Sequence, residues 1–466
     1  MQSHGSEVAQ APVLSLPSMK KAFAEYYKCP ECLVDFRLTG ELSPDVGYFR
    51  CGADTVCYGR STLGERSADV SGTLFDVSDA VKLEGGWVWL PFDPTKVVEN
   101  LQRERYSAHF RDDGHLANAM IRKTYYLLRP LLSVSIRKHL QRARLRNWQE
   151  IAFPQWPVDT TVDRLHQQMM AYLIQTKGLE TIPFIWFWPD RYTSCAIITH
   201  DVESTYGRDF TGALMDMDAA FGFRSSFQIV PENRYPVTTS YLEQIKSRGF
   251  EVNVHDLKHD GRLYADHEEF LRRAARINEY GRQFGAKGFR SGILYRNADW
   301  YDAFDFLYDM SIPNVAHLDP QRGGCCTIMP YHIGKIVELP LTCTQDYTLF
   351  HMLTDLSIDL WKRQIALIRE HYGLVTILTH PDYLLESGPQ DTYTALLRHL
   401  AHIRDTGAMW TPLPGEVARW WNERSRMQLV EREGHWRIEG QGHERARVAH
   451  AFKGPDGSVS YRIDAA

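Results

Sequence analysis

Four apolar runs of the sequence each end in polar residues that are suited to acid–base or metal chemistry. These polar residues are Asp201 and Glu203, the pair His255 and His259, then Arg290, and finally His380. Two imidazoles and one carboxylate can bind a divalent metal ion, while a second carboxylate and a third imidazole can act as base and acid. The carboxyl ends of parallel strands open onto one face of an α/β barrel, so side chains far apart in sequence converge there. The sequence therefore predicts one site that combines a metal, a base and an acid.

A regular alternation of short apolar and amphipathic segments begins at Tyr192 and would position these residues. Strands are expected at 195–200, 225–230, 250–255, 287–290, 336–341 and 374–380. Helices are expected at 213–221, 239–248, 266–284, 299–308, 355–371 and 390–404. Such alternation indicates parallel strands covered by outer helices. We therefore predict an α/β fold with a (β/α) barrel-like domain over residues 192–412.

The pair His255 and His259 has the i, i+4 spacing that places two side chains on one face of a helical turn. Both imidazoles can then reach the same ion. About one such pair is expected by chance in a chain with 19 histidines, so the spacing alone is weak evidence. The position of the pair, directly after the apolar run 252–254, strengthens it.

The order acid–x–acid, His-x3-His, Arg and Leu-x-His resembles the motif series of the polysaccharide deacetylases, carbohydrate esterase family 4. The resemblance covers residues 192–412, about half of the chain. It implies a divalent metal site, in the first place for Zn²⁺, that is formed by Glu203, His255 and His259. It also implies that Asp201 is the general base, that Arg290 orients this base, and that His380 donates a proton to the leaving amine.

Two positions depart from the family pattern. Val202 separates the two acids, which are adjacent in the common family form. The opposite assignment, with Asp201 on the metal, therefore stays open. Gly292 stands where the family has Pro two residues after the Arg. A guanidinium beside a carboxylate keeps it ionised and fixes its direction, but an ordinary salt bridge would also account for Arg290.

Four cysteines near the N-terminus have the spacing C-x2-C-x18-C-x5-C. They are Cys29, Cys32, Cys51 and Cys57. This spacing is close to the two-knuckle pattern of a zinc ribbon, although the second knuckle is wider than usual. After a flexible tail at 1–20, we expect a small zinc-ribbon-like β domain over 21–95 with a structural Zn²⁺. A ribbon that has partly lost its metal, or unrelated cysteines, are the alternatives.

Residues 96–191 are expected to form a helical connector with a basic amphipathic segment. No acidic residue lies between positions 113 and 150, where arginine and lysine alternate with leucine, isoleucine and valine. This segment can be the solvated face of a helix on the barrel, or it can contact an anionic membrane surface or a phosphate-bearing substrate. Residues 413–466 contain two short alternating runs and are expected to form a β-rich C-terminal appendage.

The composition indicates an ordinary soluble protein. Charged residues make up 24% of the chain and hydrophobic residues 44%, and the formal net charge is −5. This charge gives no sign of nucleic-acid binding, and nucleic acid is not an expected partner. Residues 1–17 lack the cationic start and apolar core of a secretory signal. We therefore expect a cytoplasmic protein.

These features predict a metal-dependent hydrolase that removes an N-acetyl group from an amino sugar of a surface-glycan precursor or a related glycoconjugate. A cytoplasmic enzyme with a basic segment suggests that this N-acetylated sugar is phosphate- or lipid-linked. The same site could instead hydrolyse a non-sugar amide. Two histidines and a carboxylate also bind Fe(II) in oxygenases, although the β/α alternation disfavours that class. A non-catalytic protein that binds partners through the ribbon and the basic helix is the remaining alternative.

Overall fold

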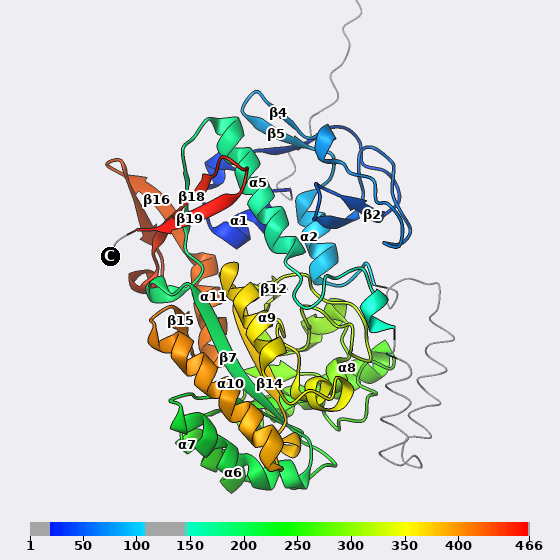
Figure 1. Ribbon diagram of the computed structural model, residues 1–466, viewed down its shortest axis with the longest axis vertical. Helices are drawn as coiled ribbons and strands as arrows, with labels where there is room; N and C mark the ends of the chain where they lie inside the picture. The colour runs from blue at the N-terminus through cyan, green and yellow to red at the C-terminus, as the bar shows by residue number, and fades with distance from the viewer. Residues whose placement is uncertain (1–18, 108–144, 146, 465–466) are drawn as a thin grey trace, which may run out of the picture.

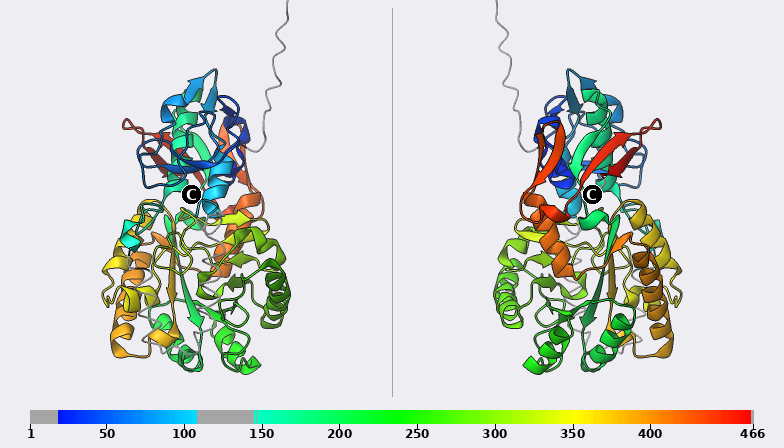
Figure 2. Two further views of the ribbon diagram at one scale, coloured as in Figure 1. Left: turned by 90° about the vertical axis from the view of Figure 1, so that its right-hand side faces the viewer. Right: turned by 90° about the vertical axis from the view of Figure 1, so that its left-hand side faces the viewer.

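The computed structural model describes residues 19–107, 145 and 147–464. These residues form a large lobe built around a curled sheet and a smaller lobe stacked on it (Figure 1). Figure 2 shows the same two lobes one above the other from two further sides. The basic amphipathic segment predicted between positions 113 and 150 lies almost entirely outside the described residues. Among the described residues, no helix combines the length and the apolar composition that crossing a membrane requires.

The described part of the large lobe contains a nine-stranded sheet in the order β12-β13-β11-β10-β9-β8-β7-β14, with β15 also paired to β7. Its strands are β7 (Ser194–Val202), β8 (Ser226–Ile229), β9 (Glu251–His255), β10 (Gly288–Arg290), β11 (Tyr308–Asp309), β12 (Tyr331–Ile333), β13 (Ile336–Glu338), β14 (Leu374–Thr379) and β15 (Met409–Trp410). All neighbours are parallel except β12, which is antiparallel to β13. All of β7 is buried, because helices cover one face of a parallel sheet and the barrel interior covers the other.

Helices surround this sheet on its outer face (Figure 1). They are α6 (Thr205–Ala220), α7 (Thr239–Ser247), α8 (His267–Phe284), α9 (Asp359–Glu370), α10 (Ser387–Asp405) and α11 (Pro414–Arg426). The prediction of α8 is confirmed, since the Asp266 side chain caps its first turn and Gly285 ends it at φ +66°. The helix predicted at 299–308 is wrong. A short 3-10 turn at Ala298–Ala303 stands there, and the chain then enters β11.

The sheet curls until the segment after β13 reaches β14. Thr342 Oγ1 donates to the carbonyl of Leu374 at 2.8 Å and accepts from the backbone N–H of Thr376 at 2.8 Å. The backbone N–H of Cys343 donates to the carbonyl of Thr376 at 3.3 Å. The gap between β13 and β14 is therefore bridged by hydrogen bonds, so the carboxyl ends of the strands face one another as in a barrel.

The small lobe combines the N-terminal region, the connector and the C-terminal run. Its helices are α1 (Lys21–Tyr27), α2 (Pro94–Gln102) and α5 (Thr161–Lys177). Its strands are β1 (Phe36–Leu38), β2 (Gly47–Arg50), β3 (Val56–Gly59), β4 (Lys82–Glu84), β5 (Trp87–Leu90), β6 (Ile182–Ile185), β16 (Gln428–Arg432), β17 (His435–Glu439), β18 (Val448–Lys453) and β19 (Val459–Ile463). β18 pairs with both β19 and β6, and the hydroxyls of Tyr27 and Tyr461 lie 2.7 Å apart. The C-terminal run predicted as an appendage therefore shares a sheet with the connector.

Candidate active site

Asp201 lies at the carboxyl end of β7 and points into the barrel. Its Oδ1 accepts from Nη1 of Arg290 at 2.8 Å, and the same nitrogen donates to Thr199 Oγ1 at 2.9 Å. Arg290 Nε also donates to the carbonyl of Met310 at 3.0 Å, which fixes the guanidinium plane. Burial alone would raise the pKa of Asp201, but the charge of Arg290 lowers the pKa below its ordinary value. Asp201 is therefore held ionised and in one direction.

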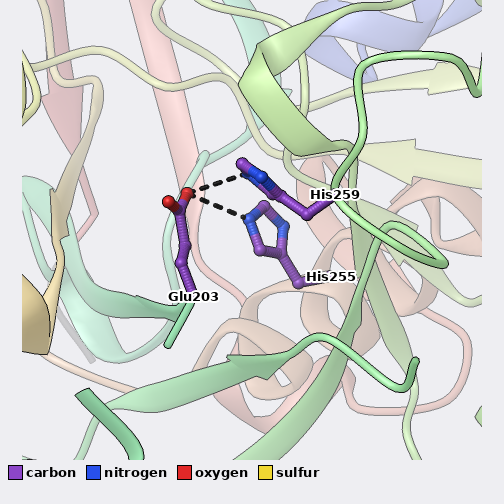
Figure 3. Close-up of side chains that lie close together, drawn as sticks. All are labelled: Glu203, His255 and His259. Carbon is purple, nitrogen blue, oxygen red and sulfur yellow. Dashed lines mark ion pairs between the residues drawn. The ribbon is translucent and has the colours of Figure 1, made fainter. Parts of the chain in front are cut away.

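Glu203, His255 and His259 point toward one another (Figure 3). Asp201 Oδ2 is 3.5 Å from His255 Nε2, so the group adjoins Asp201. Glu203 Oε1 is 2.9 Å from His259 Nε2 and 3.6 Å from His255 Nε2. One ligand atom from each of the three side chains lies within 4.8 Å of the other two. This is the only group of three or more potential metal ligands found among the described residues. The Glu203 side chain is 24% exposed whereas both imidazoles are buried, so the site opens to solvent at Glu203.

The protonation of His255 suits a metal ligand. Its Nδ1 is 3.1 Å from the carbonyl of Arg290 and must carry a proton, because a carbonyl only accepts. In the neutral ring, Nε2 then carries the free lone pair. The Nε2 atoms of His255 and His259 are buried, and neither has a hydrogen-bond partner within the described residues. Buried nitrogens without partners, both facing one carboxylate, fit a bound divalent cation.

The electrostatics of this group favour an ionised carboxylate. Burial would raise the pKa of Glu203, but the positive charge of His259 and the neighbouring imidazoles of His255 and His380 hold it well below its ordinary value. Burial would lower the pKa of His255, but the charge of Asp201 raises it above the usual range. Outside the group, Nη2 of Arg234 lies 3.0 Å from His259 Nδ1 and donates to the His259 carbonyl at 2.7 Å. Arg234 is not among the site residues predicted from the sequence.

His380 follows β14 and is held by Asp346, which is not among the residues predicted from the sequence. Asp346 Oδ1 lies 2.7 Å from His380 Nδ1, and Asp346 Oδ2 accepts from the His380 backbone N–H at 2.6 Å. His380 Nε2 points the other way and is 3.6 Å from Glu203 Oε1. Burial would lower the pKa of His380, but the buried charge of Asp346 raises it well above its ordinary value. The Asp346 carboxylate therefore orients the His380 ring, whose Nε2 faces Glu203.

Three leucines form a small apolar cluster separate from the main core. They are Leu294, Leu341 and Leu378, each at most 5% exposed. Leu378 lies two positions before His380 on β14, so both side chains share the inner face of the barrel. Leu294 follows Arg290 after a short turn. An apolar wall thus lies on the same strand face as the acid.

The structure does not bring the four N-terminal cysteines together. Cys51 and Cys57 belong to the β2–β3 hairpin, Cys29 follows α1, and Cys32 lies exposed in the next turn. No three of these thiols lie within 4.8 Å of one another in this described part of the chain. Burial raises the pKa of the Cys29 thiol and of the Cys51 thiol to about 12. The predicted structural zinc site does not fit this arrangement.

No family model matches this chain, and no curated protein matches it. Similar solved structures include a polysaccharide deacetylase from Mycobacterium smegmatis, with 18% identity, a TM-score of 0.43, and coverage of 53% of this chain and 98% of that chain. PuuE allantoinase has 12% identity, a TM-score of 0.40, and coverage of 50% and 92%. A family 4 acetyl xylan esterase from Clostridium thermocellum, in complex with cobalt, has 12% identity, a TM-score of 0.33, and coverage of 49% and 91%. The function of this chain is therefore inferred from its own residues.

Proposed function

We propose that this protein is a metal-dependent hydrolase that removes an N-acetyl group from an amino sugar. One observation carries the proposal. The carboxylate of Asp201, held ionised by Arg290, lies next to His255, and the imidazole of His380, held protonated by Asp346, lies next to Glu203. Both therefore adjoin the group Glu203, His255 and His259. Amide hydrolysis needs a base that activates water and an acid that protonates the leaving nitrogen, and this arrangement supplies both.

Each residue has a defined part in the reaction. Glu203, His255 and His259 would hold the divalent ion. When bound, this ion supplies Lewis acidity that polarises a carbonyl group and lowers the pKa of water. Asp201 Oδ2 is 3.5 Å from His255 Nε2, so the base lies next to the ligand group and accepts the proton of the attacking water. His380 then gives its Nε2 proton to the nitrogen as the C–N bond breaks, which releases acetate and a free amine.

The leucine cluster supports an acetyl group as the part that is removed. Leu378 shares the inner face of β14 with His380, and it contacts Leu294 and Leu341 rather than the main core. A methyl group placed against these side chains would be removed from water, which is favourable by about 0.8 kcal/mol for each buried carbon group. The amide nitrogen would then face His380. The proposed substrate is an N-acetylated sugar of a surface-glycan precursor or related glycoconjugate.

An acetate-release assay tests this function. Purified protein is incubated with Zn²⁺ or Co²⁺ and a panel of N-acetylated hexosamines in free, oligomeric and nucleotide-linked forms. An N-acetylated aniline represents the non-sugar amides. We expect metal-dependent acetate release from at least one sugar and none from the Asp201→Asn variant. Hydrolysis of the aniline alone, or full activity in the variant, would contradict the proposal.

A further inference from the structure

A second polar network lies behind the site, on the outer face of β7 and β14. His200 Nδ1 is 2.8 Å from Thr379 Oγ1, and His200 Nε2 is 3.0 Å from Asp218 Oδ2. The side chains of His200 and Asp218 are 0% exposed, as is Thr379. The network has no access to solvent and therefore cannot bind a substrate itself.

Asp218 anchors this network to three further elements. Ser225, just before β8, donates its hydroxyl to Asp218 Oδ2 at 2.6 Å, and Tyr393 on α10 donates to Oδ1 at 2.5 Å. A carboxylate only accepts hydrogen bonds, so His200 Nε2 carries a proton and donates as well. His200 on β7 is thus tied to α6, α10, the start of β8 and β14 at once.

The sheet register places this network directly behind the reacting groups. Thr379 is the register partner of His200 in the parallel pair of β14 and β7. Successive side chains of a strand point to opposite faces. The next residue after His200 is Asp201, which points inward to Arg290, and the next after Thr379 is His380, which meets Asp346. One hydrogen bond on the outside therefore links the two residues that precede the base and the acid.

Apolar side chains would pack this face of the sheet without any hydrogen bond. The preceding outward pair is Ile198 and Ile377, both buried and in register. A buried polar group is costly unless it is fully paired, and a paired one fixes direction as an apolar contact does not. The polar pair His200 and Thr379, at the next position along the strands, thus aligns β7 with β14 where both strands reach the site.

We propose that His200 is a positioning residue, whose hydrogen bond to Thr379 sets the placement of the base Asp201 relative to the acid His380. This inference rests on the proposed function, because it assigns those two roles. It implies that breaking the bond slows the chemical step without weakening substrate binding.

The gentlest test is Thr379→Val, which removes the hydroxyl and keeps the volume. We expect kcat for N-acetyl hydrolysis to fall by about 10-fold to 100-fold with KM within about twofold, because misplacing a reacting group by about 1 Å costs up to 10²-fold. Thr379→Ser restores the hydroxyl and should recover kcat. Ile377→Val is the matched control, since it weakens the same outward face of β14 without touching the network. It should lower the melting temperature while leaving kcat within about twofold.

A double-mutant cycle completes the experiment. If the hydrogen bond carries the effect, His200→Gln combined with Thr379→Val should lose no more kcat than the worse single variant. Additive losses, or an unchanged kcat in Thr379→Val, would overturn the positioning role while the wild-type activity stands. A wild-type protein that releases no acetate from any N-acetylated sugar would instead overturn the proposed function.

Discussion

Replacing Asp346 by Asn should convert the acid His380 into a residue that cannot protonate the leaving nitrogen. Asp346 is fully buried. Its two oxygens accept hydrogen bonds from the His380 ring, the His380 backbone N–H and the Tyr347 backbone N–H. Oδ1 accepts from the Tyr347 backbone N–H and faces His380 Nδ1, whereas Oδ2 accepts from the His380 backbone N–H, so the single acceptor oxygen of Asn cannot serve both sides. In either orientation the negative charge that raises the pKa of His380 is lost, and the imidazole is neutral over a wider pH range.

The expected fall in kcat of the Asp346→Asn variant follows from the loss of this acid. A neutral imidazole would have to become an anion to give up its last proton, so general acid catalysis is lost at any pH above the lowered pKa of His380. General acid catalysis contributes about 10²–10⁴-fold to rate, which is about 3–5 kcal/mol in the barrier. We therefore expect kcat for an N-acetylated sugar to fall by that factor. An activated aryl ester should be affected far less, because its leaving group departs without protonation.

Paired assays on the amide and the ester measure this effect, with metal content checked in each sample. The raised pKa of His380 keeps it protonated at neutral pH, so wild-type amide hydrolysis should decline only as pH rises through that raised value. In the Asp346→Asn variant, the rate of amide hydrolysis should begin to decline at a lower pH than in the wild type. Asp319→Asn, which removes a buried carboxylate bonded to Gln345, is the control and should retain kcat. Equal losses on amide and ester would refute the assignment of His380 as the acid.

Three further outcomes are expected. Asp201→Asn should abolish turnover and keep the metal, whereas Glu203→Gln should weaken metal binding by elemental analysis; the reverse result would exchange their roles. No three of the four N-terminal thiols lie close together, so the double change Cys29→Ser and Cys32→Ser should leave the metal content at about one ion per chain. Loss of one ion in this variant would instead support the predicted zinc ribbon. Burial lowers the pKa of His166 to about 3 in the folded protein from an ordinary value of 6.5. Its contribution to stability is therefore complete above pH 6.5 and is lost as pH falls toward 3, by about 2 kcal/mol at pH 5. His166→Phe should reduce the fall in unfolding free energy between pH 7 and pH 5 in urea titrations, and an unchanged fall would contradict the burial argument.

The barrel could be predicted from the sequence because its strands are buried runs with a regular period. The strands expected at 195–200, 250–255 and 374–380 are present as β7, β9 and β14. The strand expected at 336–341 is also present, as the shorter β13. β11 could not be predicted in the same way, because a run of two residues is too short to show a period.

The same distinction applies to the site. Asp201, His255 and Arg290 each lie at the end of a strand, and His380 comes directly after one, so their convergence followed from the barrel itself. Asp346 opens a short helical turn that continues into Thr348–Met352, and nothing in the local sequence sets it apart from a solvated acid. Its role depends on the bridge from Thr342 to β14, which brings this segment beside His380. The cysteines show the opposite case, since their spacing is local but their placement depends on the packing of the small lobe.

The pairing of β6 with β18 has a consequence for how the chain is made. β6 lies at the edge of its three-stranded sheet and pairs only with β18 among the described strands. Thr181 and His450, which meet across this pair, are 269 positions apart. At about 5–20 residues per second, a ribosome needs roughly 13–54 s to cover that interval. During this time the apolar segment Ile182–Ile185 has no native partner, and an unpaired apolar strand is prone to aggregation. The barrel can form first, and the small lobe can close only after synthesis has passed β18.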